Sequence, residues 1–180
     1  MSLWSEIKID AAANGPNYSA NWFSPFILFF THSGFQLLML YRLERSLRRY
    51  GLLGKAFGRM IRSLAVVLTA CHVSPNAIIA PGVVIPHATG IVIGEGVVIE
   101  SGARIYQQVT IGQVEQGLSS YPIIEKNAVL YAGAKVLGSV NIGAGAKVAA
   151  NAVVLKSVLP NVVVGGVPAK TLIKTAEKSK

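Results

Sequence analysis

The sequence predicts a mainly β protein: a parallel β-helix of hexapeptide repeats preceded by a short helical segment. The first observation is an aliphatic residue that returns at six-residue spacing. It runs through Val73, Ile79, Ile85, Ile93, Ile99, Ile105 and Ile111, and then through Leu130, Val136, Ile142, Val148 and Val154. The second is a small residue four positions after an aliphatic one, at Ala128, Ala134, Ala146 and Ala152. Three hexapeptides make one triangular coil with the aliphatic side chains inside and the small residues at tight corners.

The chain divides into three segments by this pattern. Residues 1–70 are expected to be an N-terminal segment that is mostly helical, although residues 1–20 are polar and expected to be irregular. Residues 71–159 carry the repeat and form the predicted β-helix domain. Residues 160–180 are expected to form a C-terminal cap and tail, because solenoids need a polar end.

Residues 22–41 are the most apolar stretch of the chain. About twenty apolar residues can cross a bilayer, but Pro25, Gly34 and several polar residues interrupt this stretch and argue against a span. Two interpretations stay open: a buried helical cap on the β-helix, or a monotopic contact with a membrane surface.

Seven of the 17 basic residues fall between Arg42 and Arg62, within two predicted helices, one ending near Gly51 and the next spanning residues 55–70. They form either a solvated helix face or a basic surface that holds an anionic membrane.

Composition restricts the partners and the compartment. The net charge of +9 suits anionic lipid or a polyphosphate cofactor. No nucleic-acid partner is expected, because no aromatic residues alternate with basic ones along the repeat. Cys71 is the single cysteine, which fits a reducing compartment, and residues 1–14 lack the pattern of a signal peptide. A cytoplasmic location, with the inner membrane surface as the alternative, is therefore predicted.

Two departures from the six-residue phase point to a functional site. Two extra residues near His87 separate Ile85 from Ile93, and residues 113–122 interrupt the repeat before Ile124. Excess residues project from a coil as loops, and loops on a rigid scaffold commonly carry function. We expect His87 and the projecting loop to share a pocket.

The stretch HATGIVIGE at residues 87–95 and the closing GGVPAK at 165–170 resemble the serine acetyltransferase family of left-handed β-helix acyltransferases. The resemblance implies left-handed coils, acetyl-CoA as co-substrate, no metal, and a homotrimer whose site lies between chains. It also implies that His87 is the catalytic base. A histidine with an ordinary pKa can accept a hydroxyl proton at pH 7 and return it to the leaving thiolate.

The resemblance assigns the acetyl-CoA side of the site to four positions. Ala132 and Ala150 match small residues whose backbone groups hold the pantetheine arm in a groove between coils. Lys156 and Lys170 match basic positions that meet the phosphates of CoA.

The acceptor side departs from the family. The aspartate that orients the histidine is replaced by His72, and the acid before the histidine is replaced by Pro86. An Arg-His pair of the projecting loop is replaced by Ser120 and Tyr121. Burying the two charges of serine without partners would be costly. We therefore predict a neutral acceptor, a saccharide hydroxyl bound by Tyr106, Ser120 and Tyr121.

Two alternatives remain at this point: serine O-acetylation for cysteine biosynthesis, and a non-catalytic β-helix scaffold. The group that orients His87 is also open between Glu95, Glu100 and a backbone carbonyl.

Overall fold

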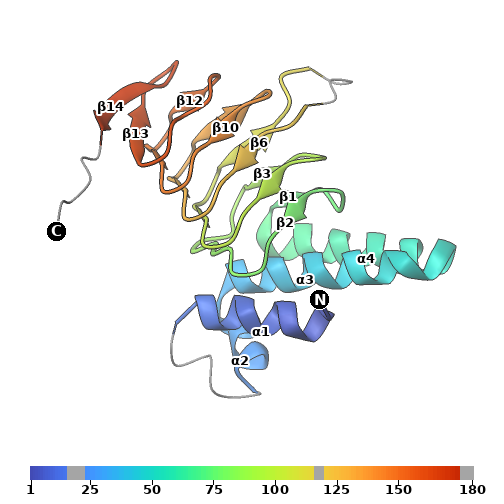
Figure 1. Cartoon of the computed structure of the whole chain (residues 1–180). Helices are drawn as coiled ribbons and strands as arrows, with labels where there is room; N and C mark the ends of the chain where they lie inside the picture. Colours follow the sequence, from blue (N-terminus) through green and yellow to red (C-terminus); the bar gives the residue numbers. More distant parts are fainter. Residues whose placement is uncertain (16–22, 116–119, 175–180) are drawn as a thin grey trace.

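The structure is a computed structural model that describes residues 1–15, 23–115 and 120–174. Figure 1 shows the helices gathered at one end of a stack of coils, with β13 and β14 at the other end. The helices are α1 (Leu3–Ala13), α2 (Ser24–Thr31), α3 (Ser33–Leu47), the 3-10 turn η2 (Arg48–Tyr50) and α4 (Gly51–Thr69). The strands of the first coils are β1 (His72–Val73), β2 (Ile78–Ile79), β3 (Val92–Ile93), β4 (Val98–Ile99), β5 (Arg104–Ile105) and β6 (Thr110–Gly112). Those of the later coils are β7 (Ile123–Ile124), β8 (Val129–Leu130), β9 (Lys135–Leu137), β10 (Asn141–Ile142), β11 (Lys147–Val148), β12 (Val153–Val154), β13 (Val162–Gly165) and β14 (Lys170–Lys174).

These strands form the three flat sides of a triangular prism. One sheet has the order β1-β3-β6-β9-β12, the second β10-β7-β4-β2, and the third β14-β13-β11-β8-β5. We call them sheets A, B and C in that order. Every pairing is parallel except that of β13 with β14, and consecutive coils keep strict register, as in Arg104 opposite Val129. The predicted β-helix is confirmed, and its three parallel sheets fit the left-handed coil.

The prism holds together by burying the residue that recurs every six positions. In most of the short strands one residue is exposed or half-buried and the next is buried, as in the exposed Ile123 and the buried Ile124. All twelve aliphatic residues of the six-residue phase are buried, and so are the four alanines at the corners. Each completely buried Val, Leu or Ile side chain contributes about 1.5–3 kcal/mol relative to exposure.

The helical segment does not follow the prediction of an irregular start. Residues 3–13 form α1, which Ser2 caps by accepting a hydrogen bond from the Ser5 amide at 3.2 Å. α1 carries a buried carboxylate, Asp10, which is 1% exposed. Residues 16–22 lie outside the described residues.

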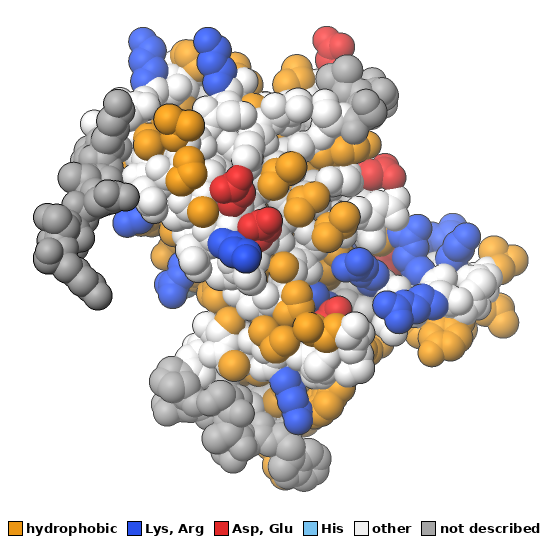
Figure 2. Space-filling model, viewed as in Figure 1, with side chains coloured by type: hydrophobic (Ala, Val, Ile, Leu, Met, Phe, Trp, Pro, Cys, Tyr) orange, Lys and Arg blue, Asp and Glu red, His pale blue; other side chains and the backbone are white. Residues whose placement is uncertain are grey.

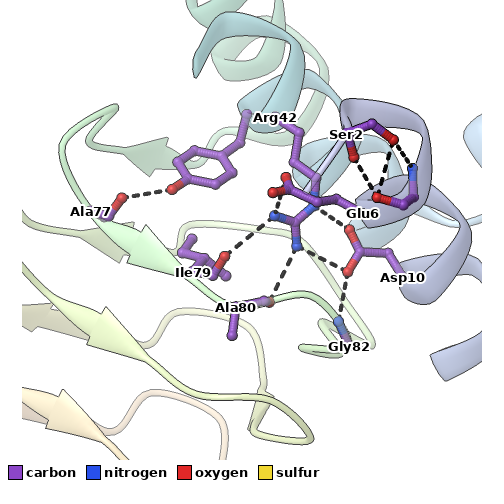
Figure 3. Close-up of polar contacts among 10 residues, drawn as sticks. Ser2, Glu6, Asp10, Arg42, Ala77, Ile79, Ala80 and Gly82 are labelled. Atoms are coloured by element: carbon purple, nitrogen blue, oxygen red, sulfur yellow. Dashed lines mark hydrogen bonds and ion pairs between the residues drawn. The ribbon is translucent and has the colours of Figure 1, made fainter. Parts of the chain in front are cut away.

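Asp10 belongs to a buried clamp centred on Arg42 of α3 (Figure 3). The Arg42 guanidinium donates to both oxygens of Asp10, with 3.0 Å from Nη2 to Oδ1. It also donates to Glu6 and to the carbonyls of Ile79 and Ala80. Burial alone would lower the pKa of Arg42, but the hydrogen bonds and charge of Asp10 outweigh burial and raise it. The clamp therefore joins α1, α3 and the first coil.

Two helices leave apolar side chains in solvent. Phe26 and Phe30 of α2 are 66% and 69% exposed, and Leu53 and Phe57 of α4 are 74% and 58% exposed. Figure 2 shows orange side chains at the outer end of α4, beside a group of blue Lys and Arg side chains. Within the described residues, no individual helix is long and apolar enough to cross a membrane, and α2 with the helix after it passes by length and composition only as a bent pair. The membrane-surface contact stays a prediction.

The last coil extends past residue 159, where the sequence pattern ends. β13 continues sheet C, and the chain then reverses so that β14 pairs with β13 in the antiparallel direction. The C-terminal end of the stack is thus closed on one side by a reversed strand, which no hexapeptide pattern indicates.

Candidate active site

His87 lies at the corner where the first coil passes from sheet C to sheet A. Ile85 is buried on the side of sheet C, and the chain returns to sheet A at β3. The two extra residues widen this turn, and the His87 side chain is exposed. His87 is therefore not an inward-facing core residue.

The N-terminus of α3 supports the turn that carries His87. The Ala88 amide donates to the Ser33 hydroxyl at 3.2 Å. Gly34 packs so closely that a Cβ at that position would lie 1.7 Å from the carbonyl oxygen of Ile85. Only glycine permits this approach, so the helical segment positions the histidine as well as covering the coil.

An aromatic column rises from His87 along the same corner. The Tyr106 ring, one coil further, lies 6.5 Å from the His87 ring between centroids, at an angle of 58°. The Tyr131 ring of the following coil stacks on Tyr106 at 5.4 Å. The structure thus places the predicted acceptor residue Tyr106 beside His87, and it adds Tyr131, which the sequence analysis did not single out.

Ala132 and Ala150 continue this corner in successive coils. Their register follows from the pairing of β8 with β11, in which Leu130 lies opposite Val148. The Asn151 amide donates to the Ala132 carbonyl at 2.9 Å, but neither the Ala132 nor the Ala150 amide donates to another described residue. These two N–H groups are available to a ligand that lies along the corner.

Lys156 and Lys170 line one cavity of about 390 Å³ at the C-terminal end of the prism. Lys156 follows β12, and Lys170 begins β14. The reversed strand β14 brings together two lysines that are separated in sequence. The pair forms a positive site at the end of the stack opposite the helices.

Ser120 and Tyr121 do not join His87 within one chain. They precede β7, at the corner between sheets A and B, whereas His87 lies at the corner between sheets C and A. Tyr121 packs over Gly96, where an added Cβ would lie 2.4 Å from Cδ2 of its ring. Residues 116–119 of the projecting loop lie outside the described residues. The shared pocket of His87 and this loop stays a prediction that needs a second chain.

The two glutamates considered as partners of His87 are engaged elsewhere. Glu95 accepts a hydrogen bond from Asn76 Nδ2 at 2.6 Å, and Glu100 accepts one from the Lys126 amide at 3.1 Å. His72 lies exposed on β1, within sheet A. Over residues 1–15, 23–115 and 120–174 no carboxylate contacts the His87 ring, and no group of three His, Cys, Asp or Glu side chains could hold a metal ion.

The class of protein follows from the fold together with comparisons with known proteins. The family described as bacterial transferase hexapeptide, with six repeats, matches residues 121–156. The serine acetyltransferase of Buchnera aphidicola from Schizaphis graminum is 40% identical over 152 residues, which is 82% of this chain and 56% of that protein. A crystal structure of serine acetyltransferase from Brucella abortus strain S19 is 33% identical, with a TM-score of 0.82, over 96% of this chain and 70% of that one. A serine acetyltransferase in complex with CoA is 30% identical, with a TM-score of 0.80, over 95% of this chain and 70% of that one.

The chain belongs to the serine acetyltransferase family of hexapeptide-repeat transferases. It spans a little over half the length of the curated relatives that it matches, for example 56% of the Buchnera protein and 51% of the serine acetyltransferase of Escherichia coli K12.

These relatives correct the predicted saccharide acceptor, which is wrong. The prediction relied on Ser120 and Tyr121, two uncharged residues, standing opposite His87 in place of a charged pair. The structure places both at another corner of the prism, so their lack of charge does not describe the surroundings of His87 in this chain. The relatives that match most of this chain are serine acetyltransferases.

Proposed function

We propose that the protein is a serine O-acetyltransferase that transfers the acetyl group of acetyl-CoA to the hydroxyl of L-serine. The observation that carries the proposal is 40% identity to a serine acetyltransferase over 82% of this chain, a stretch matched in structure by serine acetyltransferases at TM-scores near 0.8. The exposed His87 supports it, because the reaction needs a base that solvent and substrate can reach.

The chemistry assigned to His87 is general base and then general acid. Its imidazole takes the proton from the serine hydroxyl as the oxygen attacks the thioester carbonyl. The tetrahedral intermediate collapses, the carbon–sulfur bond breaks, and the imidazolium gives its proton to the leaving thiolate. The products are O-acetylserine and CoA with a free thiol.

Acetyl-CoA is proposed to lie along the corner above His87. The free N–H groups of Ala132 and Ala150 would donate to the amide carbonyls of the pantetheine arm. Lys156 and Lys170 would meet the phosphates in their cavity at the C-terminal end. This arrangement directs the thioester toward the first coils, where His87 lies.

The complete site is proposed to form between neighbouring chains of a homotrimer. A closed threefold assembly is a common symmetry for such subunits. The neighbour would supply Ser120 and Tyr121, which within one chain lie at a different corner of the prism from His87.

The test follows CoA thiol release from acetyl-CoA with L-serine as acceptor. We expect turnover that depends on L-serine, and a loss of about 10²–10⁴-fold in kcat for His87→Ala, the usual contribution of a general base. The control Ser101→Ala changes an exposed side chain at a different corner of the coil that carries Tyr106, and it should keep the rate.

Two results would contradict the proposal. One is the absence of any serine-dependent CoA release by a folded protein. The other is a His87→Ala variant that keeps the rate, with the same melting temperature as the unchanged protein.

A further inference from the structure

A second positive cavity lies at the opposite end of the prism, between α4 and the first coil. It measures about 360 Å³ and is lined by Glu44, Arg48, Lys55, Arg59, Arg62, Ser74, Pro75, Asn76 and Glu95. One wall is the α3–α4 hairpin, and the other is the turn after β1. Figure 2 shows Lys and Arg side chains gathered over this hairpin beside the coils.

The basic side chains of the cavity share one face of α4. Lys55, Arg59 and Arg62 are spaced by four and three residues, so they project from the same side of the helix. Arg48 joins them from the preceding turn η2. The opposite side of α4 carries the exposed Leu53 and Phe57.

The carboxylates of the cavity neutralise only part of this charge. Glu44, which is 3% exposed, forms an ion pair with Arg62, with 3.5 Å between Oε1 and Nε. Burial raises the pKa of Glu44, and the charges of Arg62 and Arg48 oppose that shift. Glu95 is held by Asn76. The cavity thus holds four cations and two carboxylates.

Three of the four cations are unpaired in the described residues. The side chains of Arg48, Lys55 and Arg59 make no hydrogen bond or ion pair with any residue of the described ranges. A buried anchor, Glu44, thus holds Arg62 while its neighbours are free to bind a ligand. Guanidinium groups pair with phosphate oxygens through two parallel hydrogen bonds, which suits a ligand with several anionic oxygens.

We propose that this cavity is a binding site for a soluble diphosphate group, held by Arg48, Lys55, Arg59 and Arg62. A volume of about 360 Å³ admits a diphosphate with its remaining hydration. The site is separate from the proposed CoA cavity, because the first coil lines one and the last coil lines the other. It therefore does not depend on the proposed function.

The test is isothermal titration of the full chain with inorganic pyrophosphate, in a buffer of constant ionic strength. We expect saturable binding with one site per chain. Arg59→Gln should weaken it about tenfold, as expected when a charge-assisted contact is lost. Arg49→Gln is the matched control: Arg49 is the exposed neighbour of Arg48 and does not line the cavity, so the affinity should stay unchanged.

A variant that is expected to strengthen pyrophosphate binding provides a second test. Glu95→Gln removes a negative charge from the cavity wall and keeps the shape of the side chain, so it should tighten pyrophosphate binding about three- to tenfold. Lys156→Gln, in the other cavity, should leave the one-site affinity unchanged. If Lys156→Gln abolishes the binding, pyrophosphate occupies the CoA cavity and the proposal fails.

A further experiment distinguishes a soluble diphosphate from the phosphate headgroups of a membrane. Vesicles of phosphatidylglycerol and phosphatidylcholine are sedimented with the protein, with and without pyrophosphate. We expect Arg59→Gln and Arg49→Gln to sediment alike. Vesicle binding lost with Arg59→Gln but not with Arg49→Gln, together with no pyrophosphate binding, would assign these residues to lipid and overturn the proposal. Equal loss of pyrophosphate binding in Arg59→Gln and Arg49→Gln would also overturn it, since that result indicates general charge attraction.

Discussion

The prism and the helical segment are stabilised in opposite ways. The prism buries one aliphatic residue per hexapeptide and turns the preceding residue of most strands outward, so its stability is divided among many equivalent positions. The helical segment buries a charged clamp, Asp10 and Arg42, and exposes Phe26 and Phe57. The repeat therefore has many similar stabilising positions, whereas the clamp is a single buried charged contact between the helices and the first coil.

The largest expected effect is the loss of that clamp. Arg42→Met leaves Asp10 buried without its cation, which costs about 3–5 kcal/mol in comparable buried pairs. Unfolding by guanidinium chloride, followed by circular dichroism, measures the change. The exposed Arg49→Met should stay within about 0.5 kcal/mol. A loss below 1 kcal/mol for Arg42→Met would remove the contrast between the two regions.

The next-largest effect tests whether the stability of the prism depends on the buried aliphatic residues of the six-residue repeat. Ile124→Ala should lose about 2–5 kcal/mol, because it leaves a cavity in a packed core. Ile123→Ala, one residue earlier and 40% exposed, should cost less than about 1 kcal/mol. The same unfolding measurement compares them. Equal costs would mean that the inward and outward positions of this strand are assigned wrongly.

The third prediction concerns the contact between the helical segment and the prism at the turn that carries His87. Gly34→Ala places a Cβ against the Ile85 carbonyl and should cost about 1–3 kcal/mol as an overpacked contact. Because that turn holds His87, the kcat for acetyl transfer should also fall at temperatures where the variant is still folded. The control Gly112→Ala has open space around its Cβ and should keep both. A Gly34→Ala variant with unchanged activity and unchanged melting temperature would contradict the role of α3 in positioning His87.

The smallest expected effect lies at the far end of the prism. Lys156→Gln and Lys170→Gln should each raise the KM for acetyl-CoA by about fivefold, as expected for one solvent-exposed charge pair of about 1 kcal/mol. The kcat should stay within twofold, because neither lysine lies near His87. Lys126→Gln, exposed and outside the cavity, is the matched control. A lowered kcat with constant KM would contradict the assignment.

The same contrast explains what the sequence could predict. The buried role of Ile105 or Val148 follows from spacing alone, and the off-phase position of His87 marks it as a site residue. The burial of Asp10 depends on Arg42, 32 residues later, and on the Gly82 amide, 72 residues later, so no local pattern signals it.

Local sequence patterns are limited in the same way for the residues of the candidate active site. The close packing of Gly34 against Ile85 is a contact between a helix and a coil, and the sequence HSGFQ carries no sign of it. The column of Tyr106 and Tyr131 could have been found, since both residues directly follow the buried position of their repeat. The separation of Tyr121 from His87 depends on which corner each occupies, and that requires counting the sides of every coil.

The reversed strand β14 has a consequence for how this chain behaves in a crowded solution. A stack of parallel coils ends in unpaired backbone groups, and such an edge is a template for another chain to add on. By running backwards along β13, β14 occupies that edge on sheet C with a strand whose direction a further coil does not match. The helices cover the first coil at the other end, so each end of the stack carries an element that hinders the addition of another coil.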